Sequence, residues 1–239
     1  MNIVILLAGG SGTRLNSSVA KQHIVIKDHQ IIEYTLLAFE QSPQVDDIIV
    51  VSNPQYIVNN IQLRSRFEKL VDVVPGGRTR IQSVQNAVKY LAEHYDDMDK
   101  MLFSDAVRPL VSMREIREVF SLLDAYDAVT TGVEVYETIL KTDSEGKLNA
   151  IIHRDGVLRQ TSPEGYRLFQ LKKLYLDETE ENITRYQNIG VDQLYDRGKE
   201  IGIVRSSPLN FKITTEEDLY YFEEVLRRGF CAITQGIEA

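Results

Sequence analysis

The beginning of the chain constrains the fold most. Residues 3–7 form a short, uninterrupted apolar run, and residues 8–14 follow with the sequence AGGSGTR. An apolar run of this length that ends in glycine is typical of a buried strand in a parallel sheet. The glycines let the backbone turn tightly, and the N–H groups of such a turn can surround an anion. Because Arg14 and Lys21 add positive charge nearby, the stretch predicts a phosphate site at the end of the first strand.

The spacing of these glycines excludes two common nucleotide-binding motifs. A dinucleotide-binding fold requires G-x-G-x-x-G and a P-loop requires G-x-x-x-x-G-K-[ST], and neither pattern is present. Residues 9–14 instead resemble the signature of the sugar nucleotidyltransferases. These enzymes bind a nucleoside triphosphate and transfer its nucleotidyl group to a sugar phosphate. Lys21 lies seven residues after Arg14, as it does in that superfamily.

The composition is that of an ordinary soluble globular protein. A chain of 239 residues is long enough for one well-buried α/β domain, which we expect to span residues 1–239. The formal net charge of −8 argues against nucleic-acid binding, which usually leaves a basic footprint. The single cysteine, Cys231, excludes an internal disulfide and suits a reducing compartment. The N-terminal apolar run is too short for a membrane span and follows no basic segment, so we expect no membrane partner and a cytoplasmic location.

Strand and helix patterns alternate along the chain. Apolar runs predict strands at residues 3–7, 48–51, 71–74, 101–103, 127–135 and 202–205. Helical patterns cover residues 30–40, 55–70, 83–94, 112–123 and much of 171–200. This rhythm predicts an α/β fold with a Rossmann-like, doubly wound, mostly parallel sheet. Residues 136–167 break the rhythm, and two polar, strand-like stretches around a turn at residues 142–147 predict an extended β-hairpin arm within the domain.

Two further motifs follow predicted strands and therefore belong to the same edge of the sheet, where open α/β folds bind ligands. Residues 75–84 have the sequence PGGRTRIQSV, a second tight turn with Arg78 and Arg80. Ser83 can cap the helix that follows or turn its hydroxyl toward a ligand. Asp105 follows the fourth predicted strand, where a carboxylate can hold Mg²⁺ between triphosphate oxygens or can simply form the turn.

Together these motifs narrow the resemblance. Residues 9–14, 21–22, 76–84 and 105–109 resemble the cytidylyltransferases that act on polyol phosphates, and the similarity continues to residues 211–214. This family includes the 2-C-methyl-D-erythritol 4-phosphate enzymes of isoprenoid synthesis and the ribitol-5-phosphate enzymes of wall and capsule synthesis. The resemblance implies Mg²⁺-dependent transfer of CMP from CTP to a sugar-alcohol phosphate, with release of pyrophosphate.

The resemblance also implies a role for each matching residue. The residues implied to stabilise charge on the phosphates are Arg14, Lys21 and Lys212. The nucleotide is expected beside Ala8, Gly9, Gly10, Gly12, Gly77, Arg78, Arg80 and Ser83. Asp105 would hold Mg²⁺, and the acceptor would meet Arg108, Thr138, Arg154 and Ser162. In the family, Thr138 and Arg108 can come from a partner subunit through the arm, so the resemblance implies a homodimer.

The chain departs from the family pattern mainly on the acceptor side. Ala20 and Ser104 replace the usual Pro and His, Glu164 replaces a Gln, and residues 186–192 lack the usual Thr-Asp-Glu. From these departures we expect ribitol 5-phosphate or a related polyol as acceptor, with methylerythritol phosphate as the alternative. Two other interpretations remain: a nucleotide-binding regulator without catalysis, and an enzyme that transfers UMP or another nucleotide to a hexose 1-phosphate. The reaction needs no general base, because the acceptor phosphate is already a nucleophile at neutral pH and requires only positioning and positive charge.

Overall fold

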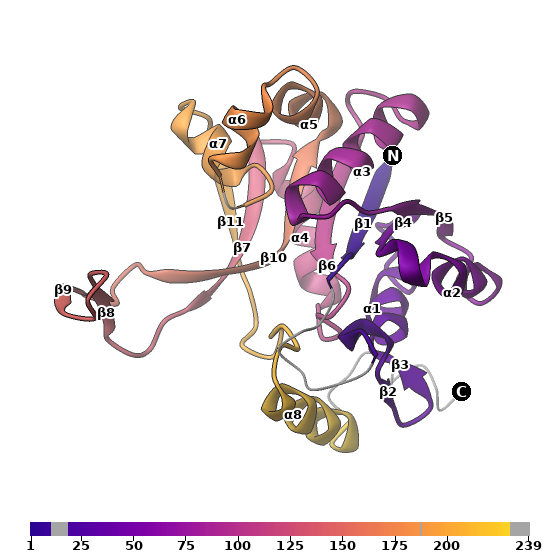
Figure 1. Ribbon diagram of the computed structural model, residues 1–239, viewed down its shortest axis with the longest axis horizontal. Coiled ribbons are helices and arrows are strands. Elements are labelled where there is room, and N and C mark those ends of the chain that lie inside the picture. Colours follow the sequence, from indigo (N-terminus) through magenta and orange to yellow (C-terminus); the bar gives the residue numbers. More distant parts are fainter. Residues whose placement is uncertain (11–18, 187, 230–239) are drawn as a thin grey trace.

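The computed structural model describes residues 1–10, 19–186 and 188–229, and a seven-stranded sheet lies at its centre (Figure 1). The strand order is β11-β7-β10-β6-β1-β4-β5. The strands are β1 (Asn2–Ala8), β4 (Asp47–Ser52), β5 (Leu70–Pro75), β6 (Lys100–Asp105), β7 (Ala128–Glu134), β10 (Leu158–Arg167) and β11 (Ile201–Arg205). All neighbouring pairs are parallel except those of β10, which runs antiparallel to β6 and β7. The predicted α/β class and mostly parallel sheet are confirmed.

Helices cover both faces of the sheet. They are α1 (Ile31–Glu40), α2 (Ile57–Gln62), α3 (Arg80–His94), α4 (Met113–Leu122), α5 (Leu168–Tyr175), α6 (Glu180–Thr184), α7 (Val191–Asp196) and α8 (Glu216–Arg227). Alternate side chains of β1 point to opposite faces: Val4 packs in a core with residues of α1 and α4, whereas Ile5 packs in a core with residues of α3 and α5. Both are fully buried, and each such side chain stabilises the fold by about 1.5–3 kcal/mol.

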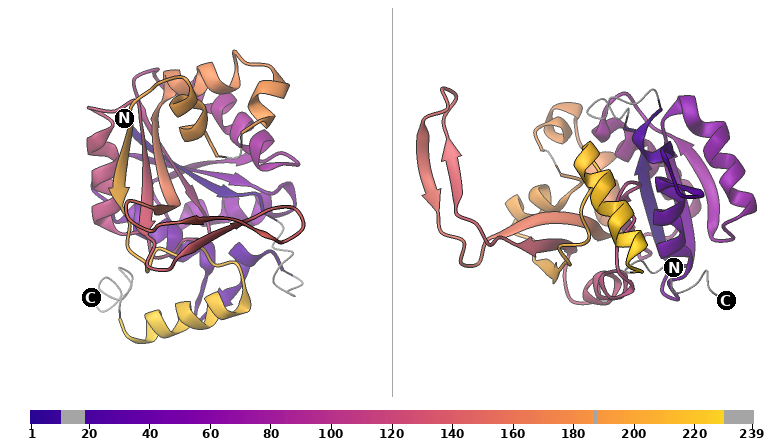
Figure 2. Two further views of the ribbon diagram at one scale, coloured as in Figure 1. Left: turned by 90° about the vertical axis from the view of Figure 1, so that its left-hand side faces the viewer. Right: turned by 90° about the horizontal axis from the view of Figure 1, so that it is seen from below.

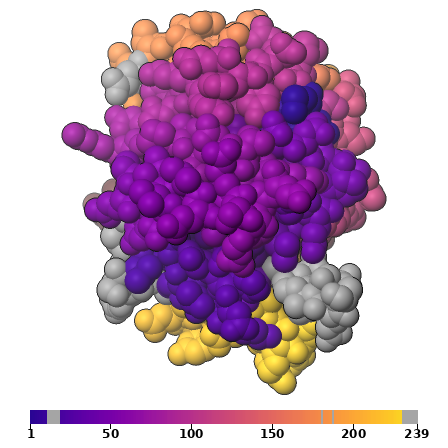
Figure 3. Space-filling model, turned by 90° about the vertical axis from the view of Figure 1, so that its right-hand side faces the viewer, coloured from indigo at the N-terminus to yellow at the C-terminus, as the bar shows by residue number. Residues whose placement is uncertain are grey.

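A third apolar cluster attaches α8 to the rest of the fold. Phe222 and Leu226 of α8 pack against Ile31 and Tyr34 of α1, beside the short strands β2 (Val25–Ile26) and β3 (His29–Gln30). Thr215 caps α8 in a capping box with Asp218. Seen from the side of β5, the first hundred residues form the centre of the surface and α8 lies at its lower margin (Figure 3).

The hairpin arm is present but shorter than the stretch assigned to it. Strands β8 (Ile139–Thr142) and β9 (Leu148–Ile152) pair antiparallel and project away from the sheet (Figure 2). Residues 158–167, predicted as part of the arm, instead form β10 inside the central sheet. Residues 161–166 are all buried although several are polar, because neighbouring strands supply partners such as Thr131, whose hydroxyl lies 2.8 Å from that of Thr161.

Two helix predictions also differ in their bounds. Residues 54–65 divide into η2 (Pro54–Tyr56), α2 and η3 (Leu63–Ser65), so the helix expected over residues 55–70 is interrupted and ends early. Helix α3 begins at Arg80, and Thr79 caps it by accepting a hydrogen bond from the N–H of Gln82. Ser83 therefore lies inside the helix and does not cap it. In the described part of the chain, none of the helices has the length and apolar character that crossing a membrane requires.

Candidate active site

A cleft of about 840 Å³ opens at the carboxyl ends of β1, β4, β5 and β6. It contains most of the residues that the sequence motifs single out. Its lining includes Ala8, Gly9, Gly10, Lys21, Gly77, Arg78, Arg80, Ser83, Asp105 and Lys212. Two of the predicted residues, Gly12 and Arg14, lie outside the described residues. The convergence follows from topology, because parallel strands end at one edge of the sheet and so do the loops that carry the motifs.

The turn after β5 is fixed by Ser83. Its hydroxyl donates to the carbonyl of Thr79 at 2.9 Å and accepts from the N–H of Gly77 at 3.0 Å. A Cβ on Gly77 would lie 2.2 Å from Cβ of Gln82, and one on Gly9 would lie 3.3 Å from Oγ of Ser83. The two glycine turns therefore pack closely around one hydroxyl, and a side chain at Gly77 would force its turn away from the start of α3.

Gly10 differs from these glycines because a side chain there would meet no described atom. Among the described residues no atom lies within 4 Å of a Cβ placed on Gly10. The side-chain amide of Gln22 donates to the carbonyls of Ala8 and Gly10 at 2.9 and 3.2 Å, which joins η1 (Lys21–His23) to the end of β1. The sequence motif includes Gln22, but its structural role was not predicted. Gly10 thus leaves room in the cleft for a ligand.

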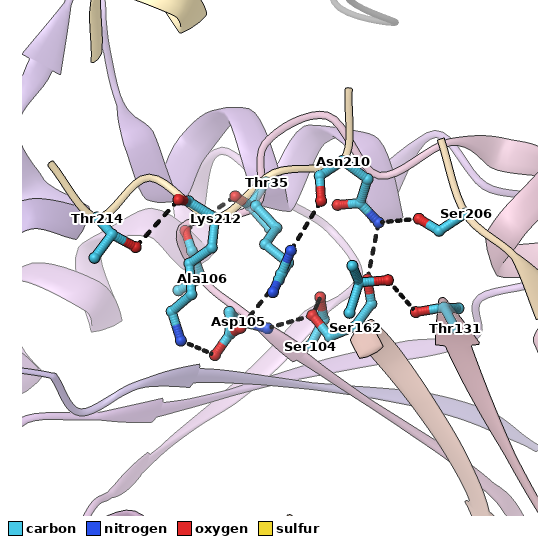
Figure 4. A network of polar contacts seen from close by, with 12 residues as sticks. Thr35, Ser104, Asp105, Ala106, Thr131, Ser162, Ser206, Asn210, Lys212 and Thr214 are labelled. Carbon is cyan, nitrogen blue, oxygen red and sulfur yellow. Dashed lines mark hydrogen bonds and ion pairs between the residues drawn. The ribbon is translucent and has the colours of Figure 1, made fainter. Parts of the chain in front are cut away.

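Asp105 holds three cations at one side of the cleft. Nζ of Lys212 lies 2.9 Å from its Oδ1, a guanidinium nitrogen of Arg80 lies 3.2 Å from the same oxygen, and Nε of Arg108 lies 3.1 Å from Oδ2. Burial opposes ionisation of Asp105, but the attraction of the three cations outweighs it and holds the pKa of this carboxyl well below its usual range. Asp105 is therefore an anion at every physiological pH. Figure 4 shows the Lys212 side chain extending toward it.

The chemistry of Asp105 suits Mg²⁺ that is shared with a substrate. In the described part of the chain no group of three or more His, Cys, Asp or Glu side chains could hold a metal ion. Mg²⁺ does not require such a group, because one carboxylate, water and substrate phosphates commonly complete its shell. Asp105 is the only carboxylate among the described residues that line the cleft. The donor set therefore fits Mg²⁺ bound with a triphosphate and not a metal site made by protein alone.

The predicted acceptor residues divide into two groups. Arg108 and Ser162 lie beside Asp105: Ser162 Oγ accepts a hydrogen bond from the N–H of Asp105 at 3.4 Å and is buried. Thr138 and Arg154 are exposed at the base of the hairpin, where Arg154 donates to the carbonyl of Tyr136 at 2.6 Å. Within one chain the structure does not bring this second pair to the cleft lining.

The sequence suggested that Glu164 places a negative charge near the acceptor. The structure corrects this expectation, because Glu164 is buried and does not line the cleft. Its side chain is buried in the core and accepts a hydrogen bond from the hydroxyl of Tyr166. Burial raises the pKa of Glu164 to about 7, against the lowering effects of Tyr166 and Arg80 and with a further rise from Asp105. Much of its charge is therefore suppressed near neutral pH.

Comparison with known proteins agrees with this geometry. The family model described as "IspD: 2-C-methyl-D-erythritol 4-phosphate cytidylyltransferase" matches residues 2–228. A 2-C-methyl-D-erythritol 4-phosphate cytidylyltransferase of Thermobifida fusca is 32% identical over 231 residues, which cover 94% of this chain and 92% of that protein. A ribitol-5-phosphate cytidylyltransferase of Lacticaseibacillus paracasei is 28% identical over 233 residues, 95% of this chain and 98% of that protein.

Solved structures give the same result for the fold. The 2-C-methyl-D-erythritol 4-phosphate cytidylyltransferase of Francisella tularensis superposes with a TM-score of 0.77 at 27% identity and covers 93% of this chain and 98% of its own. The 4-diphosphocytidyl-2C-methyl-D-erythritol synthase of Anaerococcus prevotii superposes with a TM-score of 0.79 at 21% identity, over 95% of this chain and 98% of its own. This second similarity is evidence for the fold alone. This chain belongs to the 2-C-methyl-D-erythritol 4-phosphate cytidylyltransferase family and is a cytidylyltransferase.

Proposed function

We propose that the cleft transfers CMP from CTP to a polyol phosphate. An oxygen of the acceptor phosphate attacks the α-phosphorus of CTP, the bond to the β-phosphate oxygen breaks, and pyrophosphate leaves. The observation that carries this proposal is the meeting of Lys212, Arg80 and Asp105 beside two glycine turns in one cleft. Phosphoryl transfer needs little more than positioning and fixed positive charge where negative charge develops, and this arrangement supplies both.

The residues take distinct roles in this mechanism. Lys21, Arg14 and Lys212 stabilise charge on the α-phosphate and on the leaving group. The backbone at Gly9, Gly10 and Gly77 allows close approach of the phosphates and base. The nucleotide also meets Ala8, Arg78, Arg80 and Ser83, and Gly12 keeps the nucleotide-binding role that the sequence motif assigns to it. Asp105 would hold Mg²⁺, which when bound neutralises the triphosphate and the departing pyrophosphate. Arg80, which shares Oδ1 of Asp105 with Lys212, would turn from Asp105 to the phosphates when CTP and Mg²⁺ arrive, while Lys212 stays beside Asp105.

The acceptor that the relatives favour is 2-C-methyl-D-erythritol 4-phosphate. The relatives in Thermobifida fusca and Lachnoclostridium phytofermentans, both 32% identical, carry this activity in their names. On sequence departures alone ribitol 5-phosphate was the expected acceptor, and it becomes the second candidate. One observation supports ribitol 5-phosphate. The ribitol-5-phosphate enzyme of Lacticaseibacillus paracasei is 28% identical to this chain, which is the same identity as that of the 2-C-methyl-D-erythritol 4-phosphate enzyme of Clostridium acetobutylicum.

The arm is proposed to complete the acceptor site in a homodimer. The arm projects from the body of the protein (Figure 2). Thr138 and Arg154 lie at its base, are exposed to solvent and do not line the cleft of their own chain. The arm also exposes large apolar side chains, with Leu140 60% and Ile151 55% accessible. A second copy of the chain would cover this apolar surface and could receive Thr138 and Arg154 at its acceptor site.

The test is pyrophosphate release by the purified protein with CTP and Mg²⁺. The acceptors tested in parallel are 2-C-methyl-D-erythritol 4-phosphate, ribitol 5-phosphate and glycerol phosphate. We expect one of the first two to exceed the others in kcat/KM by at least about a hundredfold, since a site built to bind a polyol's hydroxyls rejects analogues that leave its polar groups unpaired. UTP in place of CTP tests the base. CTP binding without turnover on any acceptor would overturn the proposal and favour the regulator interpretation.

A further inference from the structure

A buried polar hub lies behind the Asp105 cluster and outside the cleft lining. Glu115 of α4 and Asn210 of the loop after β11 are both 0% exposed and contact each other. We propose that Asn210 is a positioning residue, which fixes Arg108 and Lys212 in their places on Asp105. The inference rests on the proposed function in one respect, that the Asp105 cluster belongs to the reaction centre.

Glu115 is the fixed end of the hub. One of its carboxylate oxygens accepts from the N–H and the hydroxyl of Ser112, both at 2.8 Å, in the capping box of α4. The other accepts from the hydroxyl of Ser206, from the N–H of Ser207 at 3.2 Å and from the amide of Asn210 at 3.3 Å. All five donors are neutral, and the helix N-terminus adds a favourable field. The loop after β11 is thereby attached to the start of α4.

Asn210 is the loop's central attachment, and its orientation is determined by its neighbours. Its Nδ2 donates to the carbonyl of Ser162 at 2.8 Å, in addition to Oε1 of Glu115. Nδ2 also donates at 3.3 Å to Oγ of Ser206, whose own proton goes to Glu115. A flipped amide would turn Oδ1 toward a carbonyl and a carboxylate, which are both acceptors only. Oδ1 itself is buried and has no hydrogen-bond partner within the described residues. The donors of this amide, and not its acceptor, are therefore what the site uses (Figure 4).

The same residue reaches the Asp105 cluster through its backbone. The carbonyl of Asn210 accepts from a guanidinium nitrogen of Arg108 at 2.8 Å, while Nε of Arg108 contacts Asp105. Two residues further along the loop, Lys212 contacts the other oxygen of Asp105. Ser162, whose carbonyl Asn210 binds, also accepts from the N–H of Asp105. A shift of Asn210 would therefore move two cations and one backbone contact of Asp105 together.

The experiment compares Asn210→Ala with the same substitution at another buried amide, Gln170. This control residue lies at the amino ends of the parallel strands, opposite the cleft. Gln170 is 4% exposed and donates to Asp127 at 3.1 Å, beyond the far end of β10. We expect Asn210→Ala to lower kcat by about tenfold to a hundredfold, because small displacements of charged groups cost that much, with CTP affinity by calorimetry changed less than about threefold. Asn210→Asp, which sets a carboxylate against Glu115, should lose at least as much. Gln170→Ala should keep the wild-type kcat.

A double-mutant cycle separates positioning from general destabilisation. In a Lys212→Ala background, Asn210→Ala should lower kcat by a smaller factor than in the wild type, because one of the two cations that it positions is already gone. Equal losses in both backgrounds, or the same loss in Gln170→Ala, would overturn the inference.

Two further measurements keep the inference testable on its own. If Asn210→Ala does not fold, Glu115→Gln removes part of the same hub and should lower kcat with the same dependence on Lys212. A crystal structure of whichever variant folds tests the claim without turnover: Arg108 and Lys212 leave Asp105 if the inference is right and stay if it is wrong. An inactive wild type would instead count against the proposed function.

Discussion

Lys212 and Asp105 are 107 residues apart in the sequence, yet Nζ of one lies 2.9 Å from Oδ1 of the other. Asp105 ends β6 in the middle of the sheet, whereas Lys212 lies on the loop that leads from the edge strand β11 to α8. This ion pair brings the C-terminal loop to the cleft, and the backbone bond from Ile213 to Val107 at 3.0 Å supports it. The cleft therefore depends on a segment far from its glycine turns.

Removing the Asp105 charge should damage both activity and stability. The substitution Asp105→Asn would leave three cations, Lys212, Arg80 and Arg108, without their common anion. We expect the free energy of unfolding to fall by about 1–3 kcal/mol. This loss is smaller than that for a fully buried ion pair because the side chains of Arg80 and Lys212 are partly exposed to solvent. The value of kcat should fall at least a hundredfold. Urea unfolding and pyrophosphate release measure the two effects.

The pH dependence of this loss has a definite sign. Because the folded-state pKa of Asp105 is depressed, its contribution to stability is present above its unfolded value and disappears only as the pH falls through the folded value, in strong acid. Because Asp105 also raises the pKa of Glu164, the effect is measured in a Glu164→Gln background, where the loss caused by Asp105→Asn should be constant from pH 5 to 8. A difference that changed across this range would contradict the assigned ion cluster.

Gly10 and Gly77 should respond differently to alanine. At Gly77 the new methyl would collide with Gln82, so the turn must shift and the melting temperature should fall by several degrees. At Gly10 the methyl meets no described atom, and the free energy of unfolding should change by less than about 0.5 kcal/mol. If CTP phosphates approach this backbone, Gly10→Ala should nevertheless raise the KM for CTP at least tenfold. Thermal unfolding and steady-state kinetics of both variants measure these effects. An unchanged KM of Gly10→Ala for CTP would mean that the triphosphate binds elsewhere.

Some of this site can be predicted from sequence because its signals are local. The apolar run of residues 3–7 and the glycines after it predicted β1 and the cleft, since a strand buried on both faces has no polar interruption. The strand β10 escaped prediction for the opposite reason. Thr161, Ser162 and Glu164 are polar, and their burial is possible only because partners such as Thr131, Ser104 and Tyr166 come from the folded sheet.

The remaining site contacts could not be predicted because they are made by tertiary structure. A family resemblance suggested roles for Asp105 and Lys212 separately, but only the strand order and the loop after β11 bring them together. Asn210 carried no signal of its own, since its role depends on a carboxylate from α4. Thr79 and Ser83 are both plausible helix caps in sequence, and the backbone at the start of α3 decides between them.

Charges on one face of the hairpin should separate the proposed dimer. Leu140 and Ile151 are directly opposite each other in the β8–β9 register, so they share one exposed face. We expect Leu140→Glu with Ile151→Glu to yield monomers in size-exclusion chromatography with light scattering, because burying two carboxylates in an apolar contact is costly. Lys141→Glu, on the other face of the same strand, is the control and should leave the dimer intact. A wild-type monomer, or a dimer that survives both substitutions, would contradict the proposed interface.

Glu164 should make the stability of the protein depend on pH near neutrality. Its carboxyl has an ordinary pKa of 4.5 and a folded-state pKa of about 7, so the folded protein binds more protons than the unfolded chain between these values. The contribution of Glu164 is therefore most favourable below pH 4.5, and the free energy of unfolding should fall as the pH rises to 7 and then level off. Glu164→Gln should remove this slope and gain up to about 3 kcal/mol relative to wild type at pH 8.

Tyr166→Phe tests the cause of that slope. The Tyr166 hydroxyl donates to Glu164 and lowers its pKa, so without it the pKa should rise and the falling part of the curve should extend to higher pH. Urea unfolding of the wild type and both variants at pH 5, 6, 7 and 8 gives the required curves. Parallel curves for wild type and Glu164→Gln would mean that Glu164 does not titrate in this range. A Tyr166→Phe curve whose slope ends at lower pH would mean that the hydroxyl stabilises the protonated acid and not the carboxylate.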